Sequence, residues 1–477
     1  MMTMSTIPWL LSGLVFIQTG PSVPTHPSLS FSDDPGLKAL VEEALQSRPE
    51  LTQVQALREA EEQRAQRADA WPDPVLSLGI QNDSFTRLQI GEMEGSYLSI
   101  GAAQTLPWFG KRALRAEAAK AGVRRVGAIQ ERIRLTTIAE VSRAYLDLLL
   151  ARDQLGLLGK LEGLWQQTAA LTRTRYEAGQ GTQSDFLRAQ LEQNRLRQRR
   201  WALEAEEKTR RAALNRLRAL APEEPVATST TLLLLIDPRE KTPQDAWAEA
   251  EQQSPELAAA RSDAARTGVE LALARKDYFP DVTLSTGIMP RWGKFEPMWQ
   301  LSVSVNLPVW TAHKQKPAVA EGQARTRAAS ASLESIRELL RERVSERLAL
   351  LHSLRQSNQL YRAGLLVQSE ATVKSTLGQY QVGSLGLLPV LEAISGYLND
   401  VNGFLQSVAA VHKVEIALSE ASLEATATAG MGALLSGSGL SGLGAGMGPA
   451  AGGMEGGSGS APLAPQAGGA STGMKGM

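Results

Sequence analysis

The sequence contains a long internal repeat, and this repeat limits the possible folds more than any other feature. The segment Trp71–Ile80 (WPDPVLSLGI) returns as Phe279–Ile288 (FPDVTLSTGI), at an offset of 208 residues. Three other pairs of landmarks keep the same order, at offsets of 206, 201 and 204 residues. They are Arg48–Leu51 with Ser254–Leu257, Gln104–Pro107 with Val305–Pro308, and Tyr176–Gly179 with Tyr380–Gly383. Landmarks kept in register over this distance predict two structurally equivalent halves.

Composition at the two ends and in the middle sets the predicted boundaries. The apolar run Ile7–Ile17, followed by Gly, Pro and Ser residues, predicts a secretory signal peptide, with a disordered apolar N-terminus as the alternative. The C-terminal segment is rich in Gly and Met and almost uncharged, which predicts a disordered tail. The predicted parts are the signal peptide and leader (1–30), the first repeat (31–220), a proline-interrupted linker (221–242), the second repeat (243–425) and the tail (426–477).

Each half is predicted to contain helix, two strands, a very long helix, a turn and a further helix. The long helices are Lys111–Ala178 and Pro317–Val382. At about 1.5 Å per residue, each extends on the order of 100 Å. The shorter helical segments of each half together match the length of its long helix: 36–70 and 184–218 in the first half, 243–277 and 388–422 in the second. Two short helices stacked end to end should therefore lie alongside each long helix.

A 3,4 spacing of apolar side chains runs through the helical segments. Its members are Leu387, Val390, Ile394, Tyr397, Val401, Phe404, Val408, Val411 and Leu418 in the second half, with Glu415 as the one polar position. Ile138, Val141, Tyr145, Leu148 and Leu155 show the same phase in the first half, interrupted by Arg152. A mean spacing of 3.5 residues is typical of coiled-coil seams, so we interpret these aromatic and aliphatic residues as packing positions.

Alternation of apolar and polar side chains predicts four strands, at 75–82, 97–105, 282–288 and 299–306. Four strands cannot close a barrel within one chain, whereas a cyclic trimer would supply twelve. Aromatic residues gather at the strand ends, as in the girdles of transmembrane β-barrels. The girdle candidates are Trp71, Trp108, Phe109, Phe279, Trp299 and Trp310. A buried soluble sheet with ordinary Trp anchors is the alternative interpretation.

The motifs together resemble the TolC-type outer membrane efflux proteins over residues 36–425. The resemblance rests on the repeated plan, the Pro-Asp strand entries, the exit Gln104–Arg112 (QTLPWFGKR) and the paired Tyr-x-x-Gly turns. It implies a mainly α fold with a small β part, in which long coiled-coil helical hairpins form an α-barrel. Four strands per chain would contribute to a trimeric, 12-stranded transmembrane β-barrel. The LPWFGKR stretch is most similar to the heavy-metal efflux branch.

The resemblance also implies a location and partners. The expected protein is a homotrimer embedded in the lipid of a Gram-negative outer membrane and extending into the periplasm. It would be the passive exit duct of a tripartite efflux system, receiving substrate from an inner-membrane pump (RND or similar) and a periplasmic adaptor protein. The substrate, a metal cation, a small toxin or a polypeptide, is left open. The alternative is a soluble periplasmic coiled-coil scaffold or adaptor protein.

The resemblance places a periplasmic gate at the start of the last helix. In the family, two acidic residues three apart ring the closed end; here Glu392 keeps one position and Pro389 replaces the other. Three symmetry-related Glu392 carboxylates at a narrow mouth would attract cations. Asp185 is the first-half counterpart of Pro389, and it would either supply the missing charge or cap its helix. For Glu392 the competing explanation is helix-dipole complementarity.

Adaptor docking is expected at the two tip turns, 176–182 and 380–386. The docking candidates are Tyr176, Gly179, Gly181, Tyr380, Gly383 and Gly386. Glycines allow close backbone approach, and they also serve as ordinary helix C-caps. Both roles are compatible.

Composition argues against catalysis and nucleic-acid binding. The chain has no cysteine, only four histidines far apart, and 50 basic against 50 acidic side chains. No nucleophile–base pair or metal-ligand cluster emerges, so we expect no enzyme activity, no cofactor and no metal site. The basic run Arg195–Arg200 lies among glutamates, which favours ion pairing on a helix face over nucleic acid. Methionines of the tail could offer thioether ligands to a soft metal ion, but their irregular spacing and the absence of His and Cys beside them favour plain low complexity.

Overall fold

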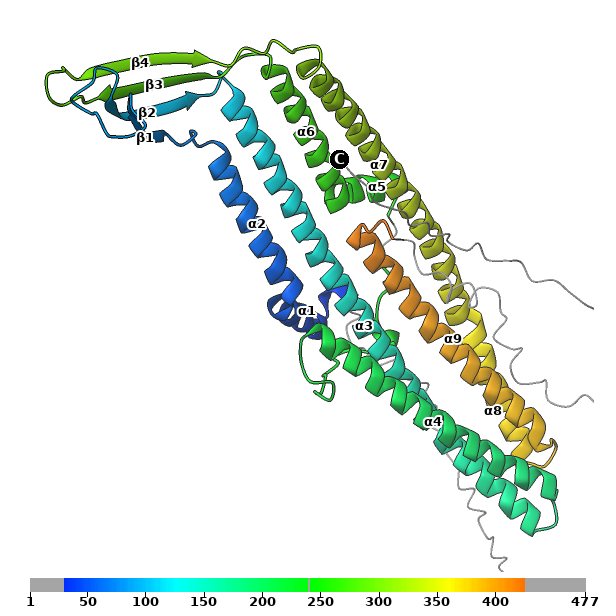
Figure 1. The fold of residues 1–477 in the computed structure, drawn as a ribbon. Coiled ribbons are helices and arrows are strands. Elements are labelled where there is room, and N and C mark those ends of the chain that lie inside the picture. The colour runs from blue at the N-terminus through cyan, green and yellow to red at the C-terminus, as the bar shows by residue number, and fades with distance from the viewer. Residues whose placement is uncertain (1–29, 239–240, 425–477) are drawn as a thin grey trace, which may run out of the picture. The chain divides into compact units, whose positions relative to one another are not determined.

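The computed structural model describes residues 30–238 and 241–424, all of which belong to one compact unit (Figure 1). The apolar run of the predicted signal peptide and the Gly- and Met-rich tail lie outside the described residues.

Both halves contain the same elements in the same order, which confirms the predicted repeat. The first half contains α1 (Pro35–Ser47), α2 (Pro49–Ala68), β1 (Val75–Gln81), β2 (Tyr97–Leu106), α3 (Lys111–Glu177) and α4 (Gln183–Leu217). The second contains α5 (Pro243–Gln253), α6 (Pro255–Lys276), β3 (Val282–Met289), β4 (Met298–Val305), α7 (Gln315–Leu360), α8 (Leu366–Gln381) and α9 (Leu387–Glu420). Short turns of other helix types are η1 (Phe31–Asp33), η2 (Leu232–Leu234) and η3 (Tyr361–Leu365).

Prolines begin the first two helices of each half. Pro49 and Pro255 occupy the first position of α2 and α6, where the missing N–H costs nothing. The residues before them, Arg48 and Ser254, are extended, so α1 and α5 end there. The helical segment of the first half is therefore divided at Pro49, and the corresponding segment of the second half is divided in the same way at Pro255.

The short helices lie end to end along the long ones, as predicted. In Figure 1, α2 and α4 follow each other along α3, while α6 and α9 follow each other along α7 and α8. Helix α3 also packs against α6 and α9, which joins the halves. Near the sheet the helix order is thus α2, α3, α6, α7; toward the other end it is α4, α3, α9, α8.

One predicted helix is interrupted. The continuous helix expected over 317–382 contains the π-helical turn η3 between α7 and α8. The wider turn lets two side chains one turn apart, Tyr361 and Leu366, both pack against the core cluster around Phe404. The rings of Tyr361 and Phe404 lie 5.9 Å apart. Tertiary packing, rather than a local sequence signal, accounts for this π-helical turn.

The core lies in the coiled-coil seams between the helices. Val141, Tyr145 and Leu148 of α3 are fully buried, as are Val408 and Val411 of α9. The predicted seam of α9 is therefore confirmed as a packing surface. The linker contributes to the same core, because Val226, Leu232 and Leu235 are buried in it.

The four strands form one antiparallel sheet in the order β1-β2-β3-β4. Strands β2 and β3 belong to different halves, yet they pair over seven residues, with Ile100 opposite Ile288 and Leu106 opposite Val282. The sheet therefore unites the two repeats in the same way as the contact of α3 with α6. Strands β1 and β4 are its two edges.

Candidate functional site

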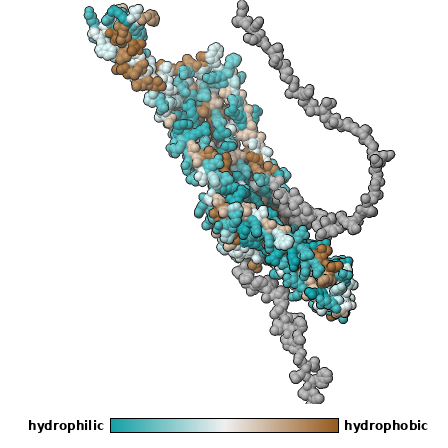
Figure 2. All heavy atoms as spheres, turned by 60° about the horizontal axis from the view of Figure 1, so that its bottom comes forward, coloured by the Kyte–Doolittle hydropathy of each residue, from teal (hydrophilic) through white to brown (hydrophobic). Residues whose placement is uncertain are grey.

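One face of the sheet is apolar and exposed. Cross-strand pairing places Leu78, Ile100, Ile288 and Trp299 on this face, together with Leu301. Leu78 is 72% exposed and Trp299 is 77% exposed. Figure 2 shows the brown patches that these strands contribute at the end of the described unit carrying the sheet. The four strands contain no charged residue. An exposed apolar face of this extent is typical of a surface covered by lipid or another chain.

The opposite face is small and polar. It carries Ser77, Gly101, Ser285, Gly287 and Ser302, which line a hollow of about 360 Å³. The hydroxyls of Ser285 and Ser302 lie 2.7 Å apart across β3 and β4. The sheet is thus amphipathic across its thickness, and its polar face can border water.

The girdle candidates divide between the two ends of the sheet. At the end that joins the helices, Trp108 stacks on Phe279 with centroids 5.3 Å apart, and the Arg112 guanidinium lies 4.1 Å from the Trp71 ring centroid. Two further candidates at this end, Phe109 and Trp310, are 85% and 72% exposed. Trp299 lies at the other end, at the start of β4. These exposures contradict the buried-sheet alternative within a single chain.

The strand–helix junction is held by a buried lysine. Lys111, the first residue of α3, is only 4% exposed. Its Nζ donates to the Phe279 carbonyl at 2.9 Å and to Asp281 Oδ1 at 3.0 Å, and it lies 3.3 Å from Asp277 Oδ1. Asp281 Oδ1 also accepts the Trp108 N–H at 2.8 Å. Burial raises the pKa of Asp281, but these donors outweigh burial and hold that pKa below its ordinary value. The contact fixes the first repeat to the second.

The tip turns follow the predicted C-cap geometry. Gly179 has φ +73° after α3, and Gly383 has φ +80° after α8, so both occupy the left-handed region that favours glycine. Gly181 and Gly386 lie outside that region, and Gly386 is the N-cap of α9. Glycine is therefore required by backbone conformation at one position in each tip.

The two tips are tied together by Arg175, a residue that the sequence analysis missed. Its Nη1 donates to the Tyr380 carbonyl at 2.9 Å, and its guanidinium lies 5.0 Å from the Tyr380 ring centroid. The Tyr380 hydroxyl lies 2.7 Å from Thr172 Oγ1. Tyr380 is only 3% exposed, which corrects its assignment as a docking side chain: it joins the two hairpins. Tyr176 is 41% exposed and stacks on Phe186.

The gate candidates lie near the tips without contacting each other. No hydrogen bond or ion pair joins Asp185 to Glu392 within 30–238 and 241–424. Glu392 is exposed in the second turn of α9, and α9 has no acidic residue in its first turn. Since dipole effects fall off within the first turn, the dipole explanation loses force for Glu392. Asp185 does lie in the first turn of α4, but Thr182, three residues earlier, is the cap. Pro389 lies in the first turn of α9.

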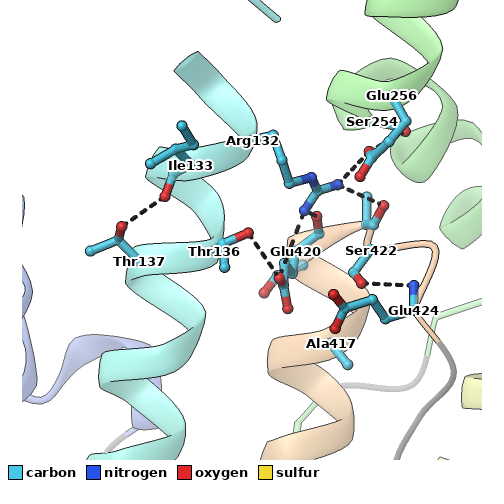
Figure 3. A network of polar contacts seen from close by, with 12 residues as sticks. Arg132, Ile133, Thr136, Thr137, Ser254, Glu256, Ala417, Glu420, Ser422 and Glu424 are labelled. Atoms are coloured by element: carbon cyan, nitrogen blue, oxygen red, sulfur yellow. Dashed lines mark hydrogen bonds and ion pairs between the residues drawn. The ribbon is translucent and has the colours of Figure 1, made fainter. Parts of the chain in front are cut away.

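A polar network fixes the end of α9 midway along α3 (Figure 3). The Glu420 carboxylate, 6% exposed, lies 2.9 Å from Arg143 and 3.7 Å from Arg132. Arg132 also pairs with Glu256 in the first turn of α6. Arg347 of α7 donates to the carbonyl of Ala417 of α9 at 2.8 Å. Helices α3, α6, α7 and α9 therefore meet at one point.

Metal-ligand clusters and apolar helices long enough to span a membrane are absent from the part of the chain that the structure describes. No group of three or more His, Asp or Glu side chains there could hold a metal ion. None of the helices described is both long and apolar enough to cross a membrane. In the basic run, Arg200 pairs with Glu162 and Glu204, and Arg195 pairs with Glu192. The prediction of ion pairing for these two arginines is confirmed.

Comparison with known protein families gives one match over both repeats. The family model described as "outer membrane efflux protein" matches residues 40–221 and 247–422. No curated protein sequence matches the chain.

Several solved structures with a similar fold are described as outer membrane proteins or channels. A structure of CusC, described in terms of transmembrane channel formation, has a TM-score of 0.70 at 18% identity and covers 84% of this chain and 96% of its own. The open-state outer membrane channel MtrE of Neisseria gonorrhoeae has a TM-score of 0.69 at 18% identity, covering 83% and 91%. The outer membrane protein VceC of Vibrio cholerae has a TM-score of 0.67 at 19% identity, covering 81% and 96%.

Proposed function

Because this chain belongs to the outer membrane efflux protein family, we propose that three copies form an exit duct in the outer membrane of a Gram-negative bacterium. The duct passively conducts substrate delivered by an inner-membrane pump (RND or similar) and a periplasmic adaptor protein. The coiled-coil helices form its periplasmic tunnel. The strands of three copies form a 12-stranded transmembrane barrel.

The amphipathic sheet is the observation that carries this proposal. Its apolar face is exposed, its opposite face is small and polar, and its strands are uncharged. A membrane barrel needs this arrangement, with lipid outside and water inside. Aromatic side chains at both strand ends fit the two interfaces of a bilayer.

Open edges support assembly from several copies. Within the described chain, β1 and β4 each pair on one side only. The row of helices also has two ends. Helices α2 and α4 of the first repeat form one end, and α7 and α8 of the second repeat form the other. The two edges differ from each other, so copies that pair through them associate head to tail, and such contacts form a ring when the rotation between copies closes. Closure removes the unpaired strand edges.

The tips provide the proposed docking surface for the adaptor. Tyr176 is 41% exposed, and Gly179 and Gly383 are exposed in the two turns. Arg175 holds the two tips at a fixed separation, so an adaptor can engage both at once. Glu392, exposed near the same end, is proposed to form the gate ring.

The runner-up function, a soluble periplasmic scaffold or adaptor, conflicts with the exposed apolar sheet. A scaffold would have to cover Leu76, Leu78 and Trp299, which are 71%, 72% and 77% exposed. The coiled-coil helices of this chain, taken alone, are compatible with either a duct or a scaffold.

Membrane fractionation combined with planar-bilayer recording tests the proposal. We expect the protein in the outer membrane fraction, as a trimer in detergent, with single-channel conductance after reconstitution. A monomeric protein that stays in aqueous solution without detergent and shows no conductance would favour the scaffold.

A further inference from the structure

The two halves of the sheet are built in the same register. An offset of 208 residues relates β1 to β3, and an offset of 201 residues relates β2 to β4. The observed pair of Ser77 with Gly101 maps under these offsets onto Ser285 with Ser302, which is also an observed pair. The repeat therefore holds at the level of individual residue pairs, and it can be applied to the strands that lack a partner.

The contact between β2 and β3 is the only strand pairing between repeats in the described chain. When the same offsets are applied to this contact, they give a pairing of β4 with β1, which would have to come from another copy. The pair Ile100–Ile288 maps onto Leu301 with Ile80. Both residues of the mapped pair lie on the apolar face. A slip of one residue would place the two side chains on opposite faces, so the mapped register is consistent with a continuous apolar face.

The ion pair between Lys111 and Asp281 at the strand–helix junction supports the same contact between β1 and β4. Asp281 pairs with Lys111 across the β2–β3 seam. Its repeat counterpart, Asp73, is exposed at the entry to the edge strand β1 and makes no ion pair with any other described residue. Both Asp73 and Asp281 follow an aromatic residue and a proline.

The counterpart of the lysine lies on the opposite edge. Lys111 and Gln315 are each the first residue of a long helix, and both are buried. The Oε1 atom of Gln315 has no hydrogen-bond partner among the described residues. Lys314 and Lys316 flank Gln315; both are exposed and neither forms an ion pair within the described chain. One edge therefore presents an unpaired acid, and the other presents two unpaired cations and a buried amide.

In the proposed 12-stranded barrel, β1 of one copy meets β4 of the next, and we infer that the register and the charged contact of this seam repeat those of the seam between the halves of one chain. Strand β1 of each copy pairs antiparallel with β4 of its neighbour, placing Ser77 opposite Ser304 of the neighbouring copy. Asp73 then receives the lysines at the start of the neighbouring α7. This inference rests on the proposed trimer and specifies the register and the ion pair that determine its assembly.

Paired cysteines test the register in a chain that has no native cysteine. Directly opposed residues of antiparallel strands have Cα atoms about 4.5–5.5 Å apart, within the range that a disulfide spans. Oxidation of the full-length S77C/S304C protein in detergent with copper phenanthroline should give dimers and trimers linked by disulfides, seen after denaturation without reductant. Neither single variant should give them.

The matched control is S77C/S302C, which tests the nearest register that keeps both side chains on the same face. Its residues should lie about 7–8 Å apart and link several-fold less. Stronger linking of S77C/S302C than of S77C/S304C would overturn the register. Absence of linking in both variants, with the trimer still detected by an amine-reactive cross-linker, would overturn the seam but leave the duct intact. A monomer by every method would overturn the proposed function itself.

Charge reversal tests the ion pair separately. Asp73→Lys should lower the temperature at which the trimer dissociates in detergent, and combining it with Lys314→Asp and Lys316→Asp should restore most of the loss. Equal losses in Asp73→Lys and in the triple variant would show that these charges do not face each other.

Discussion

At the scale of single residues, the buried lysine of the junction makes its closest ion pair with Asp281. Removing one partner of a buried ion pair leaves an uncompensated charge, which costs about 3–5 kcal/mol. Asp281 is partly exposed, so we expect Asp281→Asn to lower the free energy of unfolding by about 2 kcal/mol. Chemical denaturation in detergent measures this change.

The neighbouring acid provides the control. Asp277 also lies near Lys111 Nζ, but its side chain is 51% exposed and no backbone N–H donates to it among the described contacts. Asp277→Asn should cost only about 0.5 kcal/mol. If Asp281→Asn and Asp277→Asn lower the free energy of unfolding equally, the pair of Lys111 with Asp281 stabilises this junction no more than the more exposed pair with Asp277.

Asp153 gives the unfolding of the protein a predictable pH dependence. Burial raises its pKa from 3.8 to about 6, against the opposing effect of the Leu232 N–H, which donates to Asp153 Oδ2 at 2.7 Å. A carboxyl whose pKa is raised on folding favours the folded state fully below about pH 4, and this contribution is lost as the pH rises through about 6. At pH 7.5 the buried charge therefore destabilises the protein.

Asp153→Asn should remove that charge while its amide oxygen still accepts the Leu232 N–H. We expect the variant to be more stable than the parent by about 1–2 kcal/mol at pH 7.5, with the difference shrinking as the pH falls from 6 to 4. Denaturation series at several pH values measure both trends. A difference independent of pH would show that Asp153 does not titrate in this range.

At the scale of elements, the long helices, the four strands and the end-to-end stacking could be predicted because their signals are repetitive. Spacings of 3.5 and 2 residues accumulate over many positions, and the repeat supplies each signal twice. The π-helical turn η3 could not be predicted, since it depends on how Tyr361 packs against Phe404 on another helix.

The candidate site residues also divide into those whose role follows from the local sequence and those whose role depends on tertiary contacts. The positive φ of Gly179 and Gly383 follows from the local need of a helix C-cap, which a sequence displays. The role of Tyr380 depends on Arg175 and Thr172, about 205 residues away along the chain. The family resemblance therefore placed Tyr380 among the docking candidates, whereas its side chain is buried. Lys111 and Asp281 stand in motifs that were noticed, but only the fold shows that these motifs meet.

The tip contact should govern how independently the two hairpins move. Arg175→Ala removes both the hydrogen bond to the Tyr380 carbonyl and the cation–π contact. We expect hydrogen exchange to increase several-fold at 176–182 and 380–386, while the core of α3 near Tyr145 stays protected. Arg173→Ala is the control, because its partner Glu177 is on the same helix. Equal exchange in both variants would show that Arg175 does not restrain the tips.

At the scale of the whole molecule, the proposed gate function of Glu392 depends on the symmetry of the trimer. One Glu392 in the second turn of α9 gains little from the helix dipole and has no ion-pair partner among the described residues. Three copies around a narrow mouth would act together on every passing ion. Each charge contributes roughly 1 kcal/mol at 4 Å even in water.

Glu392→Gln should therefore reduce the cation-to-anion permeability ratio of the reconstituted duct several-fold, without changing trimer stability. Reversal potentials across a salt gradient measure that ratio. Glu338→Gln, which removes an exposed acid paired with Arg341 on α7, should leave the ratio unchanged. Asp185→Asn distinguishes the two gate candidates: if it changes the ratio and Glu392→Gln does not, the charge at the mouth belongs to α4. If neither variant changes the ratio, the narrowest part of the duct lies elsewhere and its selectivity does not depend on these acids.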